Sequence, residues 1–382
     1  MTTTALKVET AFGDAFRELL ASEPDSGLKI ARERGYQAFV DIGFPTPRLE
    51  DWKYTDVRAV ASKQWSVSEG ASDLIDAHLM NEFNVERNGF TALNQAFGAY
   101  RVVRIARETS VAEPVILHFA GADSEAIFPH VIVVAEAGSK ATIVESYTSE
   151  SAGFTNAAVQ VFVEDNANVT HYRVQKDGSE AFNYGVTEVT LGRGSRYDST
   201  NINLGGSLSR HDIELKFTAE GGEAFVDGLY MLNGSQHHDT HSVIDHTVPN
   251  CTSHQSYKGV LNDRSRGVFN GKVFVRENAH GTDAHQSNKN LLLSNDARVD
   301  TKPQLEIFND DVKCAHGATV GQLEEEELFY LLTRGLPENL ARNLLTYGFA
   351  EEIINKIGIE SIKAELDKTV LNRLTFEMEA DQ

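Results

Sequence analysis

A repeat of 28 residues constrains this chain more than any other feature. Apolar positions recur in four successive copies, and each copy continues through a turn residue into a second short strand. The recurring sets are Val131, Val159, Thr187 and Leu215; Val133, Val161, Val189 and Phe217; Ala135, Val163, Leu191 and Ala219; the turn positions Gly138, Asn166, Gly194 and Gly222; and Ala141, Val169, Tyr197 and Phe225. One such unit cannot bury its apolar face alone, so the copies must stack around a shared core.

The repeat predicts a mainly β fold built on a right-handed parallel β-helix. Propeller blades need about 40–50 residues, which is longer than this unit. A flat sandwich would form without so constant an offset. The register slips after about Phe225, although strand-like sequence continues through 267–275, 290–293 and 304–308.

Helical patterns flank the repeat. Phe12, Phe16 and Leu19 fall on one face of a helix, a second helical pattern spans 28–40, and a short helix is expected at 91–97. Pro337 suits the first turn of a C-terminal helix. The expected regions are an N-terminal helical region (1–98), a β-helix core (99–320) and a C-terminal helical region (321–382).

Charge and cysteine content exclude several functions. The chain has 56 acidic and 35 basic residues, a formal charge of −21, which argues against binding nucleic acid or an anionic membrane. Two cysteines, Cys251 and Cys314, cannot form a disulfide framework or an all-cysteine metal site within one chain. The apolar runs are too short for a membrane span, and residues 1–5 show no secretory signal. We therefore expect a cytoplasmic protein.

The sequence contains no phosphate-binding loop. The segment 267–272, Gly-Val-Phe-Asn-Gly-Lys, has one residue too few between its glycines and is followed by Val273 instead of serine or threonine. Any use of nucleotide energy would therefore require a partner.

Two groups of side chains are candidates for metal chemistry. His237, His238, His241, His246 and His254 lie close to Cys251, followed by His280 and His285. Their spacing matches no closed zinc site, and a polar ladder formed by 237–241 on the outside of the solenoid, without metal, is the simpler interpretation.

The second group points more directly to a metal-binding site. Cys314 and His316 stand two apart on an expected strand, so their side chains should share one face. A thiolate and an imidazole can bind iron or sulfur, but they supply only two ligands. Either a second chain completes the site, or the pair is a half-buried cysteine beside a hydrogen-bonded histidine.

Carboxylates offer an alternative function. Many β-helices act on polysaccharides with paired acids, so a carbohydrate-active enzyme stays open as the alternative. The acidic run 324–327 is better explained as the solvated first turn of a helix.

Three long stretches resemble the SufB/SufD family of the SUF iron–sulfur cluster assembly system. They are 43–55 (Gly-Phe-Pro-Thr-Pro-Arg-Leu-Glu-Asp-Trp-Lys-Tyr-Thr), 266–294, which contains Arg-Gly-Val-Phe-Asn-Gly-Lys, and 301–335, which contains Cys-Ala-His-Gly-Ala-Thr. The N-terminal stretch, and Cys-Ala-His-Gly-Ala-Thr in place of a His-Glu-Ala-Thr pattern, favour the SufD branch over the SufB branch.

The resemblance implies a non-catalytic scaffold subunit that forms a heterodimer with SufB and binds the ATPase SufC. It implies that a transient iron–sulfur cluster forms at the SufB interface next to His316, with Cys314 nearby, and that sulfur comes indirectly from a cysteine desulfurase. A flavin at the level of the complex and a homodimer of the isolated chain are further possibilities. It assigns SufC docking to the C-terminal helices, where we expect the contact residues Leu336, Leu340, Leu344, Phe349 and Ile353. It gives no role to Cys251 or to the histidines of 237–254.

Overall fold

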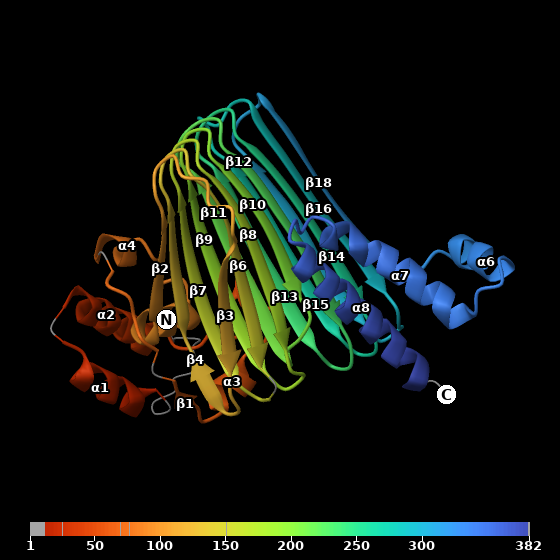
Figure 1. The fold of residues 1–382 in the computed structure, drawn as a ribbon, viewed down its shortest axis with the longest axis horizontal. Coiled ribbons are helices and arrows are strands. Elements are labelled where there is room, and N and C mark those ends of the chain that lie inside the picture. Colours follow the sequence, from red (N-terminus) through yellow and green to blue (C-terminus); the bar gives the residue numbers. More distant parts are fainter. Residues whose placement is uncertain (1–11, 25, 69, 76, 150, 381–382) are drawn as a thin grey trace.

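The computed structural model describes residues 12–24, 26–68, 70–75, 77–149 and 151–380. It confirms the parallel β-solenoid with helices at both ends (Figure 1). Residues 1–11, which include the segment without a signal pattern, lie outside the described residues.

Two parallel sheets form the body of the solenoid, and from β5 onward each coil contributes one strand to each sheet. The first sheet contains β1 (Ser66–Val67), β2 (Ala99–Ile105), β4 (Glu125–Ile127), β5 (Pro129–Ala135), β7 (Phe154–Val163), β9 (Phe182–Leu191), β11 (Leu208–Phe217), β13 (His237–His246), β15 (Arg266–Val275) and β17 (Arg298–Ile307). The second contains β3 (Val115–Gly121), β6 (Lys140–Ser149), β8 (Asn168–Asp177), β10 (Arg196–Asn203), β12 (Glu223–Leu232), β14 (Thr252–Leu261), β16 (Thr282–Leu292) and β18 (Val312–Gly321). The helices and one 3-10 turn are α1 (Gly13–Ser22), α2 (Gly27–Ile42), η1 (Glu50–Trp52), α3 (Arg58–Ser62), α4 (Ala77–Asn81), α5 (Gly89–Phe97), α6 (Glu325–Thr333), α7 (Glu338–Ile354) and α8 (Glu360–Ala380).

A left-handed residue turns the chain from the first sheet to the second in successive coils. Gly138, Asn166 and Gly194 adopt φ values of 70°, 58° and 57°, a conformation that glycine and asparagine tolerate. The amide of each of these residues donates to a backbone carbonyl in the next coil, at 2.7–3.0 Å. The predicted turn positions are therefore confirmed in these three coils.

The fourth copy of the predicted repeat is out of register. Thr187 lies beside Ile213, where the 28-residue offset predicted Leu215, and the left-handed turn residue is Gly221, where it predicted Gly222. Tyr197 lies beside Ala224, where the offset predicted Phe225. A slip of one residue reverses the face of a strand, so Ala224 is in the core and Phe225 lies on the outside.

The helices cover the outer faces of the two sheets. The N-terminal region packs aromatic residues, including Phe16, Trp52 and Phe90, against the first sheet. At the other end, α7 and α8 lie across the second sheet, where Ile353 and Ile354 pack against its strands (Figure 1). The expected N-terminal helices correspond to α1, α2 and α5, and Pro337 caps α7 as predicted. No described helix is long and apolar enough to cross a membrane.

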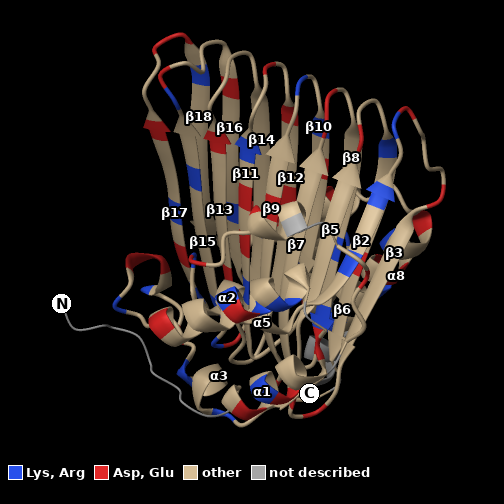
Figure 2. Cartoon of the chain, turned by 90° about the vertical axis from the view of Figure 1, so that its left-hand side faces the viewer, with Lys and Arg blue, Asp and Glu red and all other residues tan. Residues whose placement is uncertain are grey.

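Charged residues of both signs alternate along the loops at the strand ends on the side seen in Figure 2. Positive and negative residues therefore do not form separate patches along these loops.

Three buried histidines make the fold sensitive to acid. Burial lowers the pKa of His130 and His246 to about 4 and that of His238 to about 3. In the unfolded chain a histidine titrates near pH 6.5. Their contribution to stability is therefore complete above pH 6.5 and is lost as the pH falls toward 4, because only the unfolded state takes up protons there.

We expect His246→Gln to reduce the loss of stability between pH 7 and pH 5 by about 2 kcal/mol. The new amide can still bond Ser253, which His246 Nε2 contacts at 2.8 Å. Urea unfolding at the two pH values measures the difference. His280→Gln, at an exposed histidine, is the control. An equal pH slope in His246→Gln and the parent protein would contradict the assignment.

Candidate functional site

The last coil of the solenoid has an open edge. β18 ends the second sheet and, among the described strands, pairs only with β16. From Ala315 to Gly321 every residue of β18 is exposed. Proteins usually protect such edges with charges, prolines or bulges, yet Lys313 is the one charged residue in this ten-residue strand. β18 therefore presents a long row of backbone groups suited to pairing with another chain.

Cys314 and His316 both lie on β18. The register places Cys314 beside Ala284 and His316 beside Gln286, and both of these β16 residues face the interior. The two side chains therefore share the inner face of the strand, as alternation predicts. Cys314 is half-buried against the core, and burial raises the pKa of its thiol. His316 is exposed, because no further coil covers it.

A row of hydrogen-bonded polar side chains leads through the interior to His316. Gln286 Nε2 donates to Gln255 Oε1 at 2.7 Å, and Gln255 Nε2 donates to Ser242 Oγ at 2.7 Å. Gln286 Oε1 has no hydrogen-bond partner among the described residues. An unpartnered buried acceptor next to His316 marks this end of the interior as polar and incomplete.

Comparison with known proteins identifies the family to which this chain is similar. Residues 118–349 match the family described as SUF system FeS cluster assembly, SufBD core domain. An iron–sulfur cluster assembly SufBD family protein of Synechocystis is 38% identical over 342 residues, which cover 86% of this chain and 75% of the relative.

This chain belongs to the SufBD family. The iron–sulfur cluster assembly protein SufD of Escherichia coli is 29% identical, with 88% of this chain and 91% of that protein covered. SufD of Bacillus subtilis is also 29% identical, with 82% and 72% covered. The resemblance inferred from the three sequence stretches is thereby confirmed at the level of the family.

The N-terminal stretch that resembles the family fastens to the outside of the solenoid. The guanidinium of Arg210 lies 3.7 Å from the centre of the Trp52 ring, and Arg210 Nη1 donates to the Asp51 carbonyl at 2.6 Å. Thr55 Oγ1 donates to Asp239 and lies 2.9 Å from His237 Nε2. In this SufBD protein the stretch therefore has a structural role that its spacing alone did not reveal.

A buried ion-pair group lies beneath that stretch. Arg210 contacts Asp212 at 2.7 Å and Asp239 at 2.9 Å, and the three side chains are at most 5% exposed. Burial alone would raise the pKa of Asp239, but His241 and Arg210 hold that pKa well below its ordinary value.

The histidines of 237–254 do not form one ladder. The outward-ladder interpretation is wrong for His238, which is buried and bonds to Ser209. His246 is also buried and bonds to Ser253. His237 and His241 belong to the N-terminal contact through Thr55 and Asp239. His254 lies on the outer face next to Asp283 and His285. Sequence reasoning missed Asp283, because the pairing of β14 with β16 spans 31 residues instead of 28 (Thr252 with Asp283).

Cys251 lies in the hydrophobic core. Its side chain is fully buried, and burial raises the pKa of the thiol. It therefore acts as a small apolar side chain in this structure.

Four of the five residues expected to contact the ATPase lie on two different faces of α7, and Leu336 lies just before this helix. Leu340 and Leu344 are 47% and 49% exposed. Leu336 and Phe349 are partly buried, and Lys258 Nζ lies 4.5 Å from the centre of the Phe349 ring. Ile353 is fully buried against the second sheet, so it holds α7 in place. The exposed apolar surface continues onto α6 through Phe329 and Tyr330, which belong to the third family-like stretch but were not expected to contact the ATPase.

Paired carboxylates occur on the outer face of the first sheet, as the alternative enzyme would require. Glu188 and Glu214 are neighbours in register, but Arg87 forms ion pairs with both. One guanidinium thus holds both carboxylates and compensates one of their two charges, which favours a structural role.

Proposed function

We propose that this chain is a non-catalytic scaffold subunit in iron–sulfur cluster assembly. Its SufBD membership supports the process, and the exposed β18 edge with His316 on its inner face carries the more specific proposal. A SufB subunit would pair with this edge and supply the ligands that Cys314 and His316 lack. The transient cluster is then cargo shared between two chains.

His316 is the better ligand of the pair before the partner binds. Its imidazole is exposed, whereas Cys314 is half-buried with a thiol that burial keeps protonated. A thiol must lose its proton to bind metal. We therefore assign the primary role to His316 and a conditional role to Cys314, which would need a rearrangement of the last coil.

The ATPase SufC would dock on the surface formed by α6 and the exposed side of α7. No residue of α6 is buried, although the helix carries Phe329 and Tyr330, which are 68% and 55% exposed. In Figure 1, α6 extends away from the solenoid. A helix with exposed aromatic residues and little contact with its own chain is suited to a groove on another protein.

The test is His316→Ala in the assembled complex with SufB and SufC. We expect the yield of assembled cluster, measured by absorption and iron content, to fall by at least about tenfold, as losing a ligand should weaken binding at least as much as losing a supporting contact. The matched control is His280→Ala at an exposed histidine outside β18, which should leave the yield unchanged. Equal yields in His316→Ala and the parent complex would refute the assignment.

A further inference from the structure

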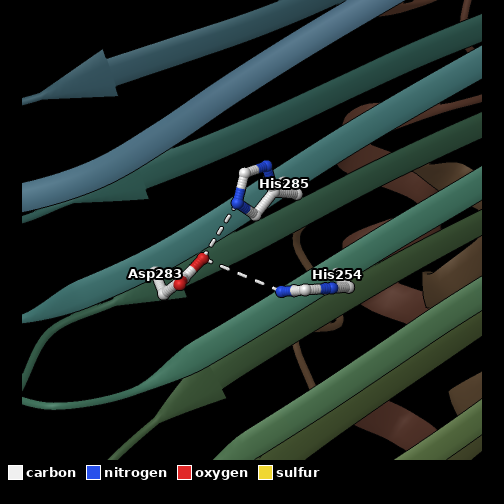
Figure 3. A group of neighbouring side chains, drawn as sticks. All are labelled: His254, Asp283 and His285. Atoms are coloured by element: carbon white, nitrogen blue, oxygen red, sulfur yellow. Dashed lines mark ion pairs between the residues drawn. The ribbon is translucent and has the colours of Figure 1, made fainter.

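Three metal-binding side chains converge on the outer face of the second sheet. His254 lies on β14, and Asp283 and His285 lie on β16 (Figure 3). Asp283 Oδ1 is 3.1 Å from His285 Nε2 and 3.7 Å from His254 Nε2. One ligand atom from each residue lies within 4.8 Å of the others.

The strand register produces this convergence. His254 and His285 are direct partners on neighbouring parallel strands, and Asp283 precedes His285 by two residues, so the three side chains share the outer face. The His254 ring also contacts Phe225 on β12, with ring centres 5.5 Å apart. Phe225 restricts where the His254 imidazole can turn and keeps it beside Asp283.

The separations suit a metal ion. Ligands about 2.1 Å from a tetrahedral metal lie roughly 3.4 Å from one another, and the two measured separations fall on either side of that value. Asp283 Oδ1 is shielded from solvent and accepts no hydrogen bond of good geometry from the described residues. This carboxylate oxygen, which has an imidazole nitrogen of His285 and one of His254 nearby, is an acceptor available to a cation.

We propose that His254, Asp283 and His285 bind a divalent first-row transition metal ion. Two histidines and one carboxylate are a ligand set used for iron(II) with open coordination positions. The side chains are 47%, 39% and 50% exposed, and His254 and His285 border an open hollow of about 540 Å³, which leaves room for water or an exchanging ligand. The choice of iron(II) as the physiological ion rests on the proposed function.

The site lies one strand away from the Cys-x-His pair. In the register, Asp283, Ala284, His285 and Gln286 lie beside Lys313, Cys314, Ala315 and His316. The metal site is on the outer face of the sheet, and Cys314 and His316 are on the inner face. We therefore assign this metal site a role in holding an iron ion next to the β18 edge, where the cluster would form.

Two lysine side chains near the site affect how tightly it would bind a metal ion. Lys313 lies opposite Asp283, and its charge opposes that of a bound ion. Lys356 also borders the hollow, but it forms an ion pair with Asp227 at 2.8 Å. We expect Lys313→Met to tighten binding of the ion.

The experiment titrates the full-length chain with Co²⁺, and anaerobically with Fe²⁺, and follows heat and the visible absorption of Co²⁺. We expect one ion per chain. Asp283→Asn and His285→Ala should each weaken binding at least about tenfold. His280→Ala, at an exposed histidine outside the site, should bind as the parent does, and thermal unfolding confirms that each variant is folded. Absence of binding by the parent, or equal binding by His285→Ala, would overturn the proposal and leave an ion-pair cluster only.

Cluster yield in the assembled complex separates this inference from the proposed function. Loss of yield in His316→Ala, together with Co²⁺ binding by the parent that His285→Ala weakens, supports both sites. Normal yield in His316→Ala with the same Co²⁺ result would refute the role of His316 and retain the metal site. Absence of Co²⁺ binding by the parent, with loss of yield in His316→Ala, would refute only the metal site.

Discussion

Replacing Leu340 and Leu344 together with glutamate should lower the affinity for the ATPase SufC by at least about 100-fold while the chain stays folded. Apolar anchors at the centre of an interface each contribute about 2 kcal/mol or more, and a buried, unpaired glutamate adds a desolvation cost. Both leucines are about half exposed, so the substitution removes little packing within the chain. Calorimetric titration with SufC measures the change.

The control is Ile116→Glu on β3, in the first coils of the solenoid. Ile116 is 65% exposed, and the substitution introduces the same chemistry far from α7. Ile353→Glu is unsuitable, because that side chain is fully buried and its replacement would unfold the contact between α7 and the sheet. Unchanged affinity in a folded Leu340→Glu, Leu344→Glu variant would place the ATPase elsewhere.

Arg210→Met should destabilise the chain by about 3–5 kcal/mol. The substitution keeps most of the side-chain volume beside Trp52 but leaves Asp212 and Asp239 buried without their shared cation. Removing one member of a buried ion pair costs this much because the remaining charge is uncompensated. Chemical unfolding at pH 7 measures the difference in the free energy of unfolding.

Arg193→Met provides the comparison on the surface. Arg193 pairs with Glu220 at 2.9 Å, but the two side chains are 62% and 50% exposed. Such pairs contribute at most about 1 kcal/mol. If the two variants lost the same stability, burial would not be the reason that Arg210 matters.

The sequence predicted the architecture because stacking imposes a regular pattern. Val131, Val159 and Thr187 do lie side by side, but the next coil is shorter by two residues (Phe182 pairs with Leu208). Turn length is set by local backbone geometry that the apolar pattern does not encode, so the register was lost there. The helices α3 and α4 were missed because five residues carry too little periodicity.

The candidate site was predictable where it depended on one strand. Alternation alone placed Cys314 and His316 on a common face. The convergence of His254, Asp283 and His285 depends on the register between two strands, and the anchoring of Trp52 and Thr55 depends on contacts across more than 150 residues. Neither follows from local spacing, because each requires knowledge of which strands are neighbours.

The helices α7 and α8 connect several coils of the solenoid, because hydrogen bonds join this helical segment to strands of different coils. Lys258 on β14 bonds the Phe349 carbonyl at 3.0 Å, the Gly358 amide donates to Tyr172 Oη on β8 at 2.8 Å, and Arg373 Nη1 donates to the Met231 carbonyl on β12 at 3.0 Å. A mechanical load applied to α6 is therefore shared among several coils at once, instead of peeling the last one away. Helix α6 and the coils that contain β8, β12 and β14 are therefore joined into one mechanical unit.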